Sequence, residues 1–291
     1  MRDIVGKNMA KSLNIKAICW IAAIAVITVA AELVFGSVPV AIFSFPINVL
    51  SLALWLTLLS IIYKQRQSSS VARFMLSQGA VWLSFTLMAA VSIFLGLERK
   101  PSSDSWPVII AILFILSHLV LITMRGWRNT KGVRWRFTIL HLGLILALGA
   151  GFWGAPDREL LRIAVDSRPN DEAYYTDSTP HVLGHTLRLE DYDIEYSESG
   201  APEHYEAIVA IDDTLATISV NHPYALTWSE RIYLISLGQS PTGETYCILE
   251  IVSEPWQWLS TVGIVMLIIG AVMMFIGGPR RNVEPQKKSK I

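Results

Sequence analysis

The apolar run Phe137–Trp153, FTILHLGLILALGAGFW, leads almost directly into an acidic block that extends from Ala155 to Glu254. This block contains 19 Asp and Glu, 5 Arg and no Lys, although the formal net charge of the 291-residue chain is zero. The rest of the chain therefore carries 5 acidic and 19 basic residues. A long apolar helix that leads into so large a charged segment predicts a soluble domain attached to a membrane anchor.

Outside this block the chain has the composition of a membrane protein, since 52% of all residues are hydrophobic and only 16% are charged. Six apolar runs have about the ~20 residues that a helix needs to cross a ~30 Å hydrocarbon layer. We place them at Ala17–Phe35, Pro46–Tyr63, Gly79–Leu97, Val108–Met124, Phe137–Trp153 and Trp258–Gly277. The first run is too long for a signal-peptide core, so we expect it to be retained.

The acidic block is expected to form a β-rich domain. Its β-branched and apolar runs are short, and turn-like clusters such as Asp212-Asp213 and Asn221–Pro223 separate them, which is typical of antiparallel sheets. The predicted strands are Thr186–Tyr196, Tyr205–Ile211, Thr214–Val220, Arg231–Leu237 and Thr245–Ile251. The predicted fold is a polytopic α-helical membrane protein with six spans and one extracytoplasmic β-rich domain before the last span. Its expected regions are 1–136 (four spans), 137–154 (fifth span), 155–254 (β-rich domain), 255–278 (sixth span) and 279–291 (basic tail).

The distribution of Lys and Arg predicts the orientation. In a six-span arrangement the N-terminal tail, the segments after spans two and four, and the C-terminal tail share one side of the membrane and hold 17 basic residues. The alternating segments hold 7. Basic loops stay in the cytoplasm, so both termini are expected there, in a bacterial inner membrane, with the acidic domain in the periplasm.

Three ionisable residues inside the predicted spans are candidate functional residues, because such groups are costly in lipid. Glu32 lies near the outer end of the first span, where it can also reach the interface. His118 and His141 lie on consecutive antiparallel spans, each about 7–9 Å from the cytoplasmic end. Neutral imidazole is a good axial ligand for haem iron, and it also forms hydrogen bonds between packed helices.

The soluble block shows no motif of a metal site or a hydrolase. Cys19 and Cys247 do not form a CxxC pair, and His181, His185, His204 and His222 lack zinc-ligand spacing, so we interpret these histidines as surface residues. Neither a Gly-x-Ser-x-Gly elbow nor a Gly-rich phosphate loop is present.

From His141 to the end, the chain resembles the ResB/CcsB family, one half of the system II machinery of cytochrome c synthesis. The most specific element is Val220-Asn-His-Pro, which a tyrosine-containing strand follows at Arg231-Ile-Tyr. The other matching segments are His141-Leu-Gly-Leu-Ile-Leu-Ala-Leu-Gly-Ala-Gly, Leu187-Arg-Leu-Glu-Asp-Tyr-Asp-Ile-Glu-Tyr, Gly200-Ala-Pro and Val252-Ser-Glu-Pro-Trp.

The resemblance implies a complex subunit that helps to move haem b outward and deliver it to apocytochrome c. It implies a CcsA-type membrane partner with a tryptophan-rich haem motif, and it places a haem ligand at His141; His118 is a second candidate from its depth alone. This chain has no WxWD segment and no obvious acid or nucleophile, so we do not expect it to catalyse haem attachment alone. The expected surroundings are the lipid bilayer and protein partners, with no nucleic acid.

The chain also departs from the family pattern. The family more often has four spans in this half, the outer domain here is short, and Glu254 stands where an aspartate is expected. Two other functions remain open: a cofactor-free membrane scaffold whose outer domain binds another protein, and a solute transporter that uses Glu32 and the membrane histidines as a proton path.

Overall fold

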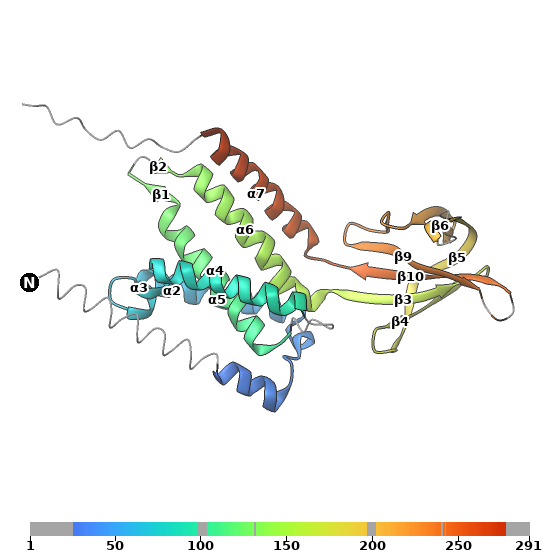
Figure 1. Ribbon diagram of the computed structural model, residues 1–291, viewed down its shortest axis with the longest axis horizontal. Coiled ribbons are helices and arrows are strands. Elements are labelled where there is room, and N and C mark those ends of the chain that lie inside the picture. The colour runs from blue at the N-terminus through green and yellow to red at the C-terminus, as the bar shows by residue number, and fades with distance from the viewer. Residues whose placement is uncertain are drawn as a thin grey trace, which may run out of the picture. The chain divides into compact units, whose positions relative to one another are not determined.

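A computed structural model describes residues 26–97, 104–130, 132–196, 202–239, 241 and 243–277. These residues form helices and one large antiparallel sheet, and they divide into two compact units (Figure 1). The helical unit contains residues up to 39, 50–152 and from 259 onward; the sheet unit contains residues 40–49 and 153–258. Each unit is described by itself below.

Five helices are long and apolar enough to cross a membrane. They are α2 (Ile47–Lys64), α4 (Gln78–Leu97), α5 (Trp106–Gly126), α6 (Trp135–Gly154) and α7 (Gln257–Gly277). These helices have the length and composition typical of a membrane protein, and they coincide with the last five predicted spans to within a few residues. The expected first span lies partly outside the described residues; its described part is the shorter apolar helix Val26–Phe35. Six spans are therefore not established.

Helix α5 is the most buried of the five candidate spans in the helical unit, since half of its most apolar stretch is covered by other parts of the chain. Pro107 stands in its first turn, where the missing N–H costs no helical hydrogen bond. A short helix, α3 (Ser70–Met75), follows α2, and the strands β1 (Arg128–Asn129) and β2 (Gly132–Val133) form a small hairpin between α5 and α6. Leu59, Met75, Val120 and Leu121 form a buried apolar cluster that joins α2, α3 and α5.

Helices α6 and α7 approach closely because small residues line their contact (Figure 1). A Cβ atom added at Gly143 would lie 2.7 Å from the Gly263 carbonyl oxygen, and one added at Gly263 would lie 2.5 Å from the Ala147 nitrogen. Such backbone proximity is typical of small-residue packing between membrane helices.

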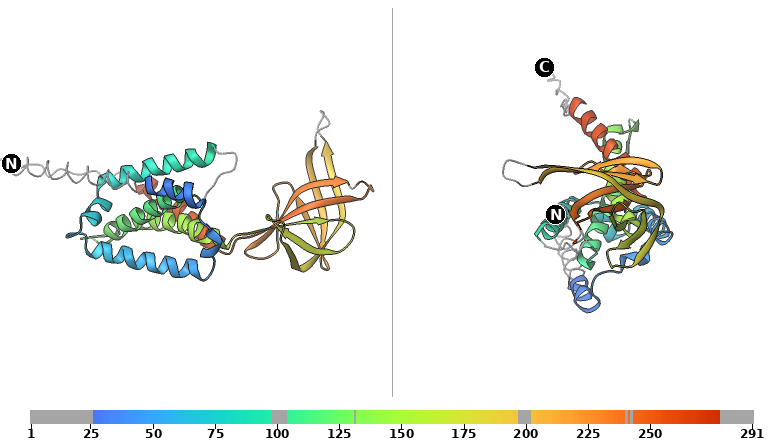
Figure 2. Two further views of the ribbon diagram at one scale, coloured as in Figure 1. Left: turned by 90° about the horizontal axis from the view of Figure 1, so that it is seen from below. Right: turned by 90° about the vertical axis from the view of Figure 1, so that its right-hand side faces the viewer.

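The sheet unit contains eight antiparallel strands in the spatial order β7-β6-β5-β4-β3-β10-β9-β8. Their bounds are β3 Glu159–Val165, β4 Asn170–Tyr175, β5 Pro180–Tyr196, β6 Pro202–Ile211, β7 Thr214–Ser219, β8 Tyr224–Ala225, β9 Glu230–Gln239 and β10 Thr245–Ser253. The sheet curls so that its two ends approach each other (Figure 2). The Tyr205 hydroxyl on β6 donates a hydrogen bond to the Ile235 carbonyl on β9 at 3.3 Å, and Ser219 at the end of β7 forms a β-bridge with His222, just before β8.

The prediction of an antiparallel β-domain is confirmed, and all five predicted strands are present. Strands β3, β4 and the two-residue β8 were not predicted from the sequence. Strand β3 alternates between exposed and buried residues around Leu161, Ile163 and Val165, and these three belong to the apolar core inside the curl. The predicted turns at Asp212 and Asn221 do contain residues of positive φ, +51° and +64°, a backbone conformation that Asp and Asn tolerate best among residues with a side chain.

A short connection ties the segment before α2 to the base of the sheet unit. The Asp157 carboxylate accepts hydrogen bonds from the Phe45 backbone N–H at 2.7 Å, the Asn48 side chain at 2.6 Å and the Trp256 indole N–H at 2.7 Å. Asp157 lies in the 3₁₀ helix η2 (Ala155–Asp157), and Phe45 follows the 3₁₀ helix η1 (Val40–Phe43). One carboxylate therefore joins three segments that lie far apart in the sequence.

Candidate functional site

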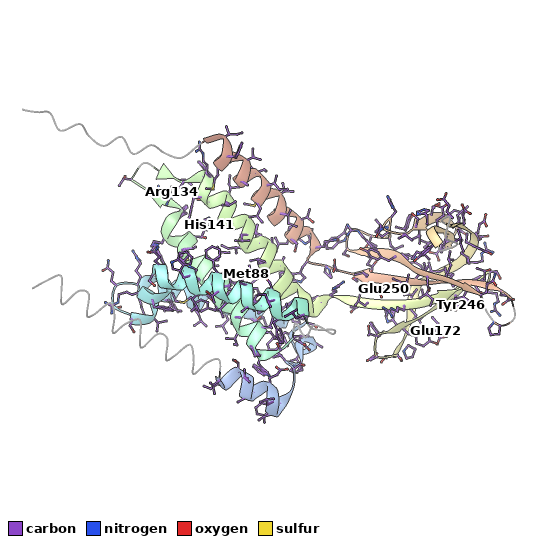
Figure 3. All side chains as sticks on the ribbon, in the orientation of Figure 1. Met88, Arg134, His141, Glu172, Tyr246 and Glu250 are labelled. Carbon is purple, nitrogen blue, oxygen red and sulfur yellow. The ribbon has the colours of Figure 1, made fainter. Side chains whose placement is uncertain are left out.

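His141 lies on α6, one turn after Phe137 (Figure 3). Its Nδ1 is 2.8 Å from the Phe137 carbonyl oxygen, and the two rings stack with centroids 3.8 Å apart. A carbonyl oxygen accepts hydrogen bonds but cannot donate them, so Nδ1 carries the proton, and Nε2 of the neutral ring carries the lone pair. The ring is only partly buried. This is the tautomer and orientation that an imidazole needs to ligate a metal through Nε2.

His118 lies on α5 and has a different environment. Its Nδ1 donates to the Met75 carbonyl at 2.7 Å, and the residue is only 3% exposed. Its Nε2 is buried and has no hydrogen-bond partner in the structure. An unpaired buried acceptor costs ~1–3 kcal/mol, so this atom is an unusual feature of the helical unit. Both histidines therefore present an Nε2 lone pair, but the packed side chains around His118 leave no face open to a porphyrin.

The two rings do not share a hydrogen-bond partner: His118 is fixed by the end of α3, and His141 by its own helix. The end of α3 is held in place by a second contact, because the Arg125 guanidinium donates to the Leu76 carbonyl at 2.5 Å. The segment after the second predicted span is thus a packed element rather than a solvated loop. No feature of the sequence indicated this contact between α3 and α5.

Glu32, the third ionisable residue of the predicted spans, has a structural partner. Its carboxylate accepts a hydrogen bond from the Trp106 backbone N–H at 2.9 Å, at the first turn of α5. Ser105, the N-cap residue of α5, forms no capping hydrogen bond through its own side chain. A carboxylate at a helix N-terminus satisfies an unpaired N–H and interacts favourably with the helix dipole. This role accounts for Glu32 without a proton path.

The histidines of the sheet unit do not form a metal site, since no group of three or more His, Cys, Asp or Glu in the described residues lies close enough to hold a metal ion. His185 pairs with Asp212 at 2.8 Å, and His181 Nδ1 lies 3.3 Å from the Tyr175 hydroxyl. Both line a pocket in the sheet unit, together with Glu159 and Glu230. From the sequence, these histidines were predicted only to be surface residues. The signal that could have indicated the pocket is the alternation of exposed and buried residues along β3, which places Glu159 on the same face as Leu161.

The thiol of Cys247 is fully buried in the sheet, and burial raises its pKa to about 12. A thiol of this kind is unreactive at neutral pH, because the thiolate is the nucleophile. Cys19 lies outside the described residues. The structure therefore offers no thiol chemistry at Cys247, in agreement with the absence of a paired cysteine motif.

The model of the ResB-like family matches residues 131–248, which include α6 with His141 and most of the sheet unit. A comparison with curated proteins found no match. Within the matched region, the helix that carries His141 leads directly into the first strand of the sheet. Residues 131–248 of this chain match the model of the ResB-like family, in agreement with the resemblance found in the sequence, and at the level of the family this match supports a role of the cytochrome c biogenesis type.

Proposed function

We propose that the chain is the ResB-type subunit of a system II cytochrome c maturation complex and that it binds haem b in transit through His141. The observation that carries this proposal is the Nδ1 hydrogen bond of His141 to Phe137, within the part of the chain that matches the family. It leaves the lone pair on Nε2 of a partly exposed histidine, on a helix that is apolar enough to cross a membrane. When bound, haem supplies the iron and the vinyl groups that become attached to cytochrome cysteines.

The residues around His141 fit an axial ligand. The carbonyl of Phe137 fixes the ring tautomer, as a hydrogen-bonded carbonyl does for many metal-ligating histidines. Stacking against Phe137 limits rotation of the ring about its side-chain bonds. The phenylalanine ring is in turn covered by the Arg134 guanidinium at 4.8 Å, so the first turns of α6 form a short ordered stack.

His118 remains the candidate for a second nitrogen ligand, because its Nε2 lone pair has no partner. Access to this atom requires the end of α3 to move away from α5, since Met75 and its neighbours bury the ring. A histidine from the CcsA-type partner is the alternative source of the second ligand. The variants in the experiment below separate the two sources.

The sheet unit is proposed to bind the CcsA-type partner or the apocytochrome on the periplasmic side of the bacterial inner membrane. Its acidic surface suits a basic client, and both termini of the chain are proposed to be cytoplasmic from the distribution of Lys and Arg. The sequence showed no obvious acid or nucleophile for thioether formation. We therefore assign to this chain the binding and positioning of haem, and leave attachment to the complete complex.

The test is the visible spectrum of the detergent-purified chain, co-expressed with a CcsA-type partner. We expect a Soret band in the wild type that is lost or shifted in His141→Gly and is restored by added imidazole, which can occupy the vacated site. His118→Ala should change the iron from six- to five-coordinate if His118 is the second ligand; an unchanged spectrum assigns that ligand to the partner. The matched control is His222→Ala, an exposed histidine of the sheet unit.

Two outcomes would count against the proposal. Equal Soret bands in the wild type and in His141→Gly, with the complex still assembled, would remove His141 from the haem site. The absence of haem from every assembled sample would favour the cofactor-free scaffold.

A further inference from the structure

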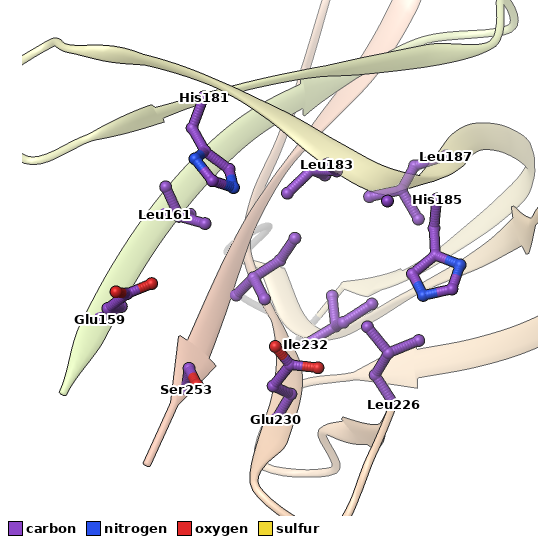
Figure 4. A pocket seen from close by; sticks show the side chains of 12 residues that line it. Glu159, Leu161, His181, Leu183, His185, Leu187, Leu226, Glu230, Ile232 and Ser253 are labelled. Atoms are coloured by element: carbon purple, nitrogen blue, oxygen red, sulfur yellow. The ribbon is translucent and has the colours of Figure 1, made fainter. Parts of the chain in front are cut away.

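A pocket of about 250 Å³ lies in the sheet unit, at the end where β3 begins and β10 ends (Figure 4). Its floor is apolar and includes Leu161, Ile232 and Ile251. Its polar lining includes two carboxylates, Glu159 and Glu230. The pocket is smaller than the ~300–1,000 Å³ sites that hold drug-sized ligands, so it suits a side chain or a small molecule rather than a porphyrin.

Strand register explains why the two carboxylates face the same pocket. Glu159 pairs with Ser253 across β3 and β10, and Ser253 pairs with Glu230 across β10 and β9. Directly paired residues point to the same face of a sheet, so the three side chains form one polar row. The next row on that face is Leu161, Ile251 and Ile232, which is entirely apolar.

A tight loop orients one of the carboxylates. The backbone N–H groups of Leu226 and Thr227 donate to the Glu230 carbonyl at 3.0 and 3.3 Å, and the Thr227 hydroxyl donates to the Glu230 carboxylate at 3.2 Å. Trp228 lies at the tip of this loop and is 68% exposed. Exposed tryptophans of this kind are frequent anchors in protein–protein contacts.

The described part of the chain supplies no Arg or Lys to this pocket; the basic side chains that line it are His181 and His185, and His185 is paired with Asp212. Arg231 alternates to the opposite face of β9 from Glu230. The other four arginines of the acidic block pair with carboxylates outside the pocket: Arg158 with Glu254, Arg162 with Glu250, Arg168 with Asp166, and Arg188 with Glu190. Two like charges that face one small pocket repel each other, so the site favours an external cation.

We propose that this pocket binds the side chain of a lysine that a partner polypeptide presents. A lysine has a flexible four-carbon stem that suits the apolar floor, and an ammonium with three donors. The polar row offers three acceptor groups, the carboxylates of Glu159 and Glu230 and the hydroxyl of Ser253. The exposed Trp228 favours a polypeptide over a free amine, because it offers a second contact beside the pocket. The inference goes beyond the proposed function, since it requires no haem.

The test is fluorescence polarisation with the full-length chain in a neutral detergent. The probe is a fluorescein-labelled Gly/Ser peptide that carries a single lysine. The double variant Glu159→Gln/Glu230→Gln should bind it at least about tenfold more weakly than the wild type, because both charge-assisted hydrogen bonds are lost. The control Asp171→Asn/Glu172→Gln removes the same charge from exposed positions of β4 and should change the affinity less than about twofold. Circular dichroism checks that both variants keep the sheet.

Further probes define the ligand. Acetylation of the lysine should abolish binding, and Trp228→Ala should weaken it. Equal losses in the two double variants would show that only the overall charge attracts the peptide, and would overturn the proposal. Binding of the acetylated peptide would overturn it as well. Displacement of the peptide by an equal concentration of n-butylammonium would identify a free amine as the ligand and overturn the assignment to a polypeptide.

Discussion

Asp212 shows how a single side chain shapes the sheet unit. Its Oδ1 accepts hydrogen bonds from the Thr186 backbone N–H at 2.8 Å and hydroxyl at 3.2 Å, and its Oδ2 pairs with His185 at 2.8 Å. These contacts hold residues 183–186 of β5, which form a bulge opposite the single residue Asp171 of β4. Three residues of this bulge, Leu183, Gly184 and His185, line the pocket. The backbone hydrogen bond from Thr186, with a smaller contribution from His185, lowers the pKa of Asp212.

The first prediction follows from the direction of this shift. Since the pKa of Asp212 is lower in the folded chain than in the unfolded chain, its carboxylate stabilises the fold at every pH above the unfolded value of ~3.9. That stabilisation is lost as the pH falls through the lower folded value. Asp212→Asn should therefore lower the thermal midpoint of the sheet signal by a few degrees at pH 7, and the difference from wild type should vanish in acid. Asp213→Asn is the matched control, and an equal loss there would contradict the role of Asp212.

At the scale of elements, the close contact between α6 and α7 depends on glycines in both helices. The backbone of α7 at Gly263 lies against the backbone of α6 between Gly143 and Ala147, and Gly270 lies against Leu140 in the same way. The helix that makes this close contact, α6, also carries His141.

The second prediction tests this contact. Gly263→Ala should destabilise the helical unit by about 1–3 kcal/mol, because the new Cβ would meet backbone atoms at 2.5–3.0 Å and the helices must separate. The control Gly149→Ala adds the same atom to α6 where nothing lies within 4 Å, and should be neutral or slightly stabilising. The measurement is the thermal midpoint of helix unfolding in detergent. Equal midpoints for the two variants would show that α6 and α7 do not depend on this contact.

At the scale of the whole molecule, the two charge populations predict which parts face the cytoplasm. The third prediction is that Ser178→Cys, in the turn between β4 and β5, reacts with a membrane-impermeant maleimide in intact cells. Thr130→Cys, beside the basic hairpin between α5 and α6, should react only after the inner membrane is opened. The wild type provides the blank for any labelling of its own two cysteines; burial raises the pKa of the Cys247 thiol to about 12, so Cys247 should contribute little. The reverse labelling pattern would invert the proposed orientation.

The sequence by itself determined the membrane-type composition, the last five apolar helices, the antiparallel character of the acidic domain and the resemblance of residues 131–248 to the ResB-like family. These properties depend on apolar runs, on local β-propensity and on short motifs, all of which can be read within a window of about 20 residues. The tautomer of His141 is also local, because its hydrogen-bond partner Phe137 lies one helical turn away.

Only the tertiary structure decided which distant residues meet. The contact of His118 with Met75, the capping of α5 by Glu32 and the three donors to Asp157 all join segments that lie at least 43 residues apart. The polar row of Glu159, Ser253 and Glu230 depends on the register of three strands, and a shift of one residue in that register would turn these side chains to the other face. Helix packing and strand register are fixed by the burial of whole faces, which no local pattern of residues specifies.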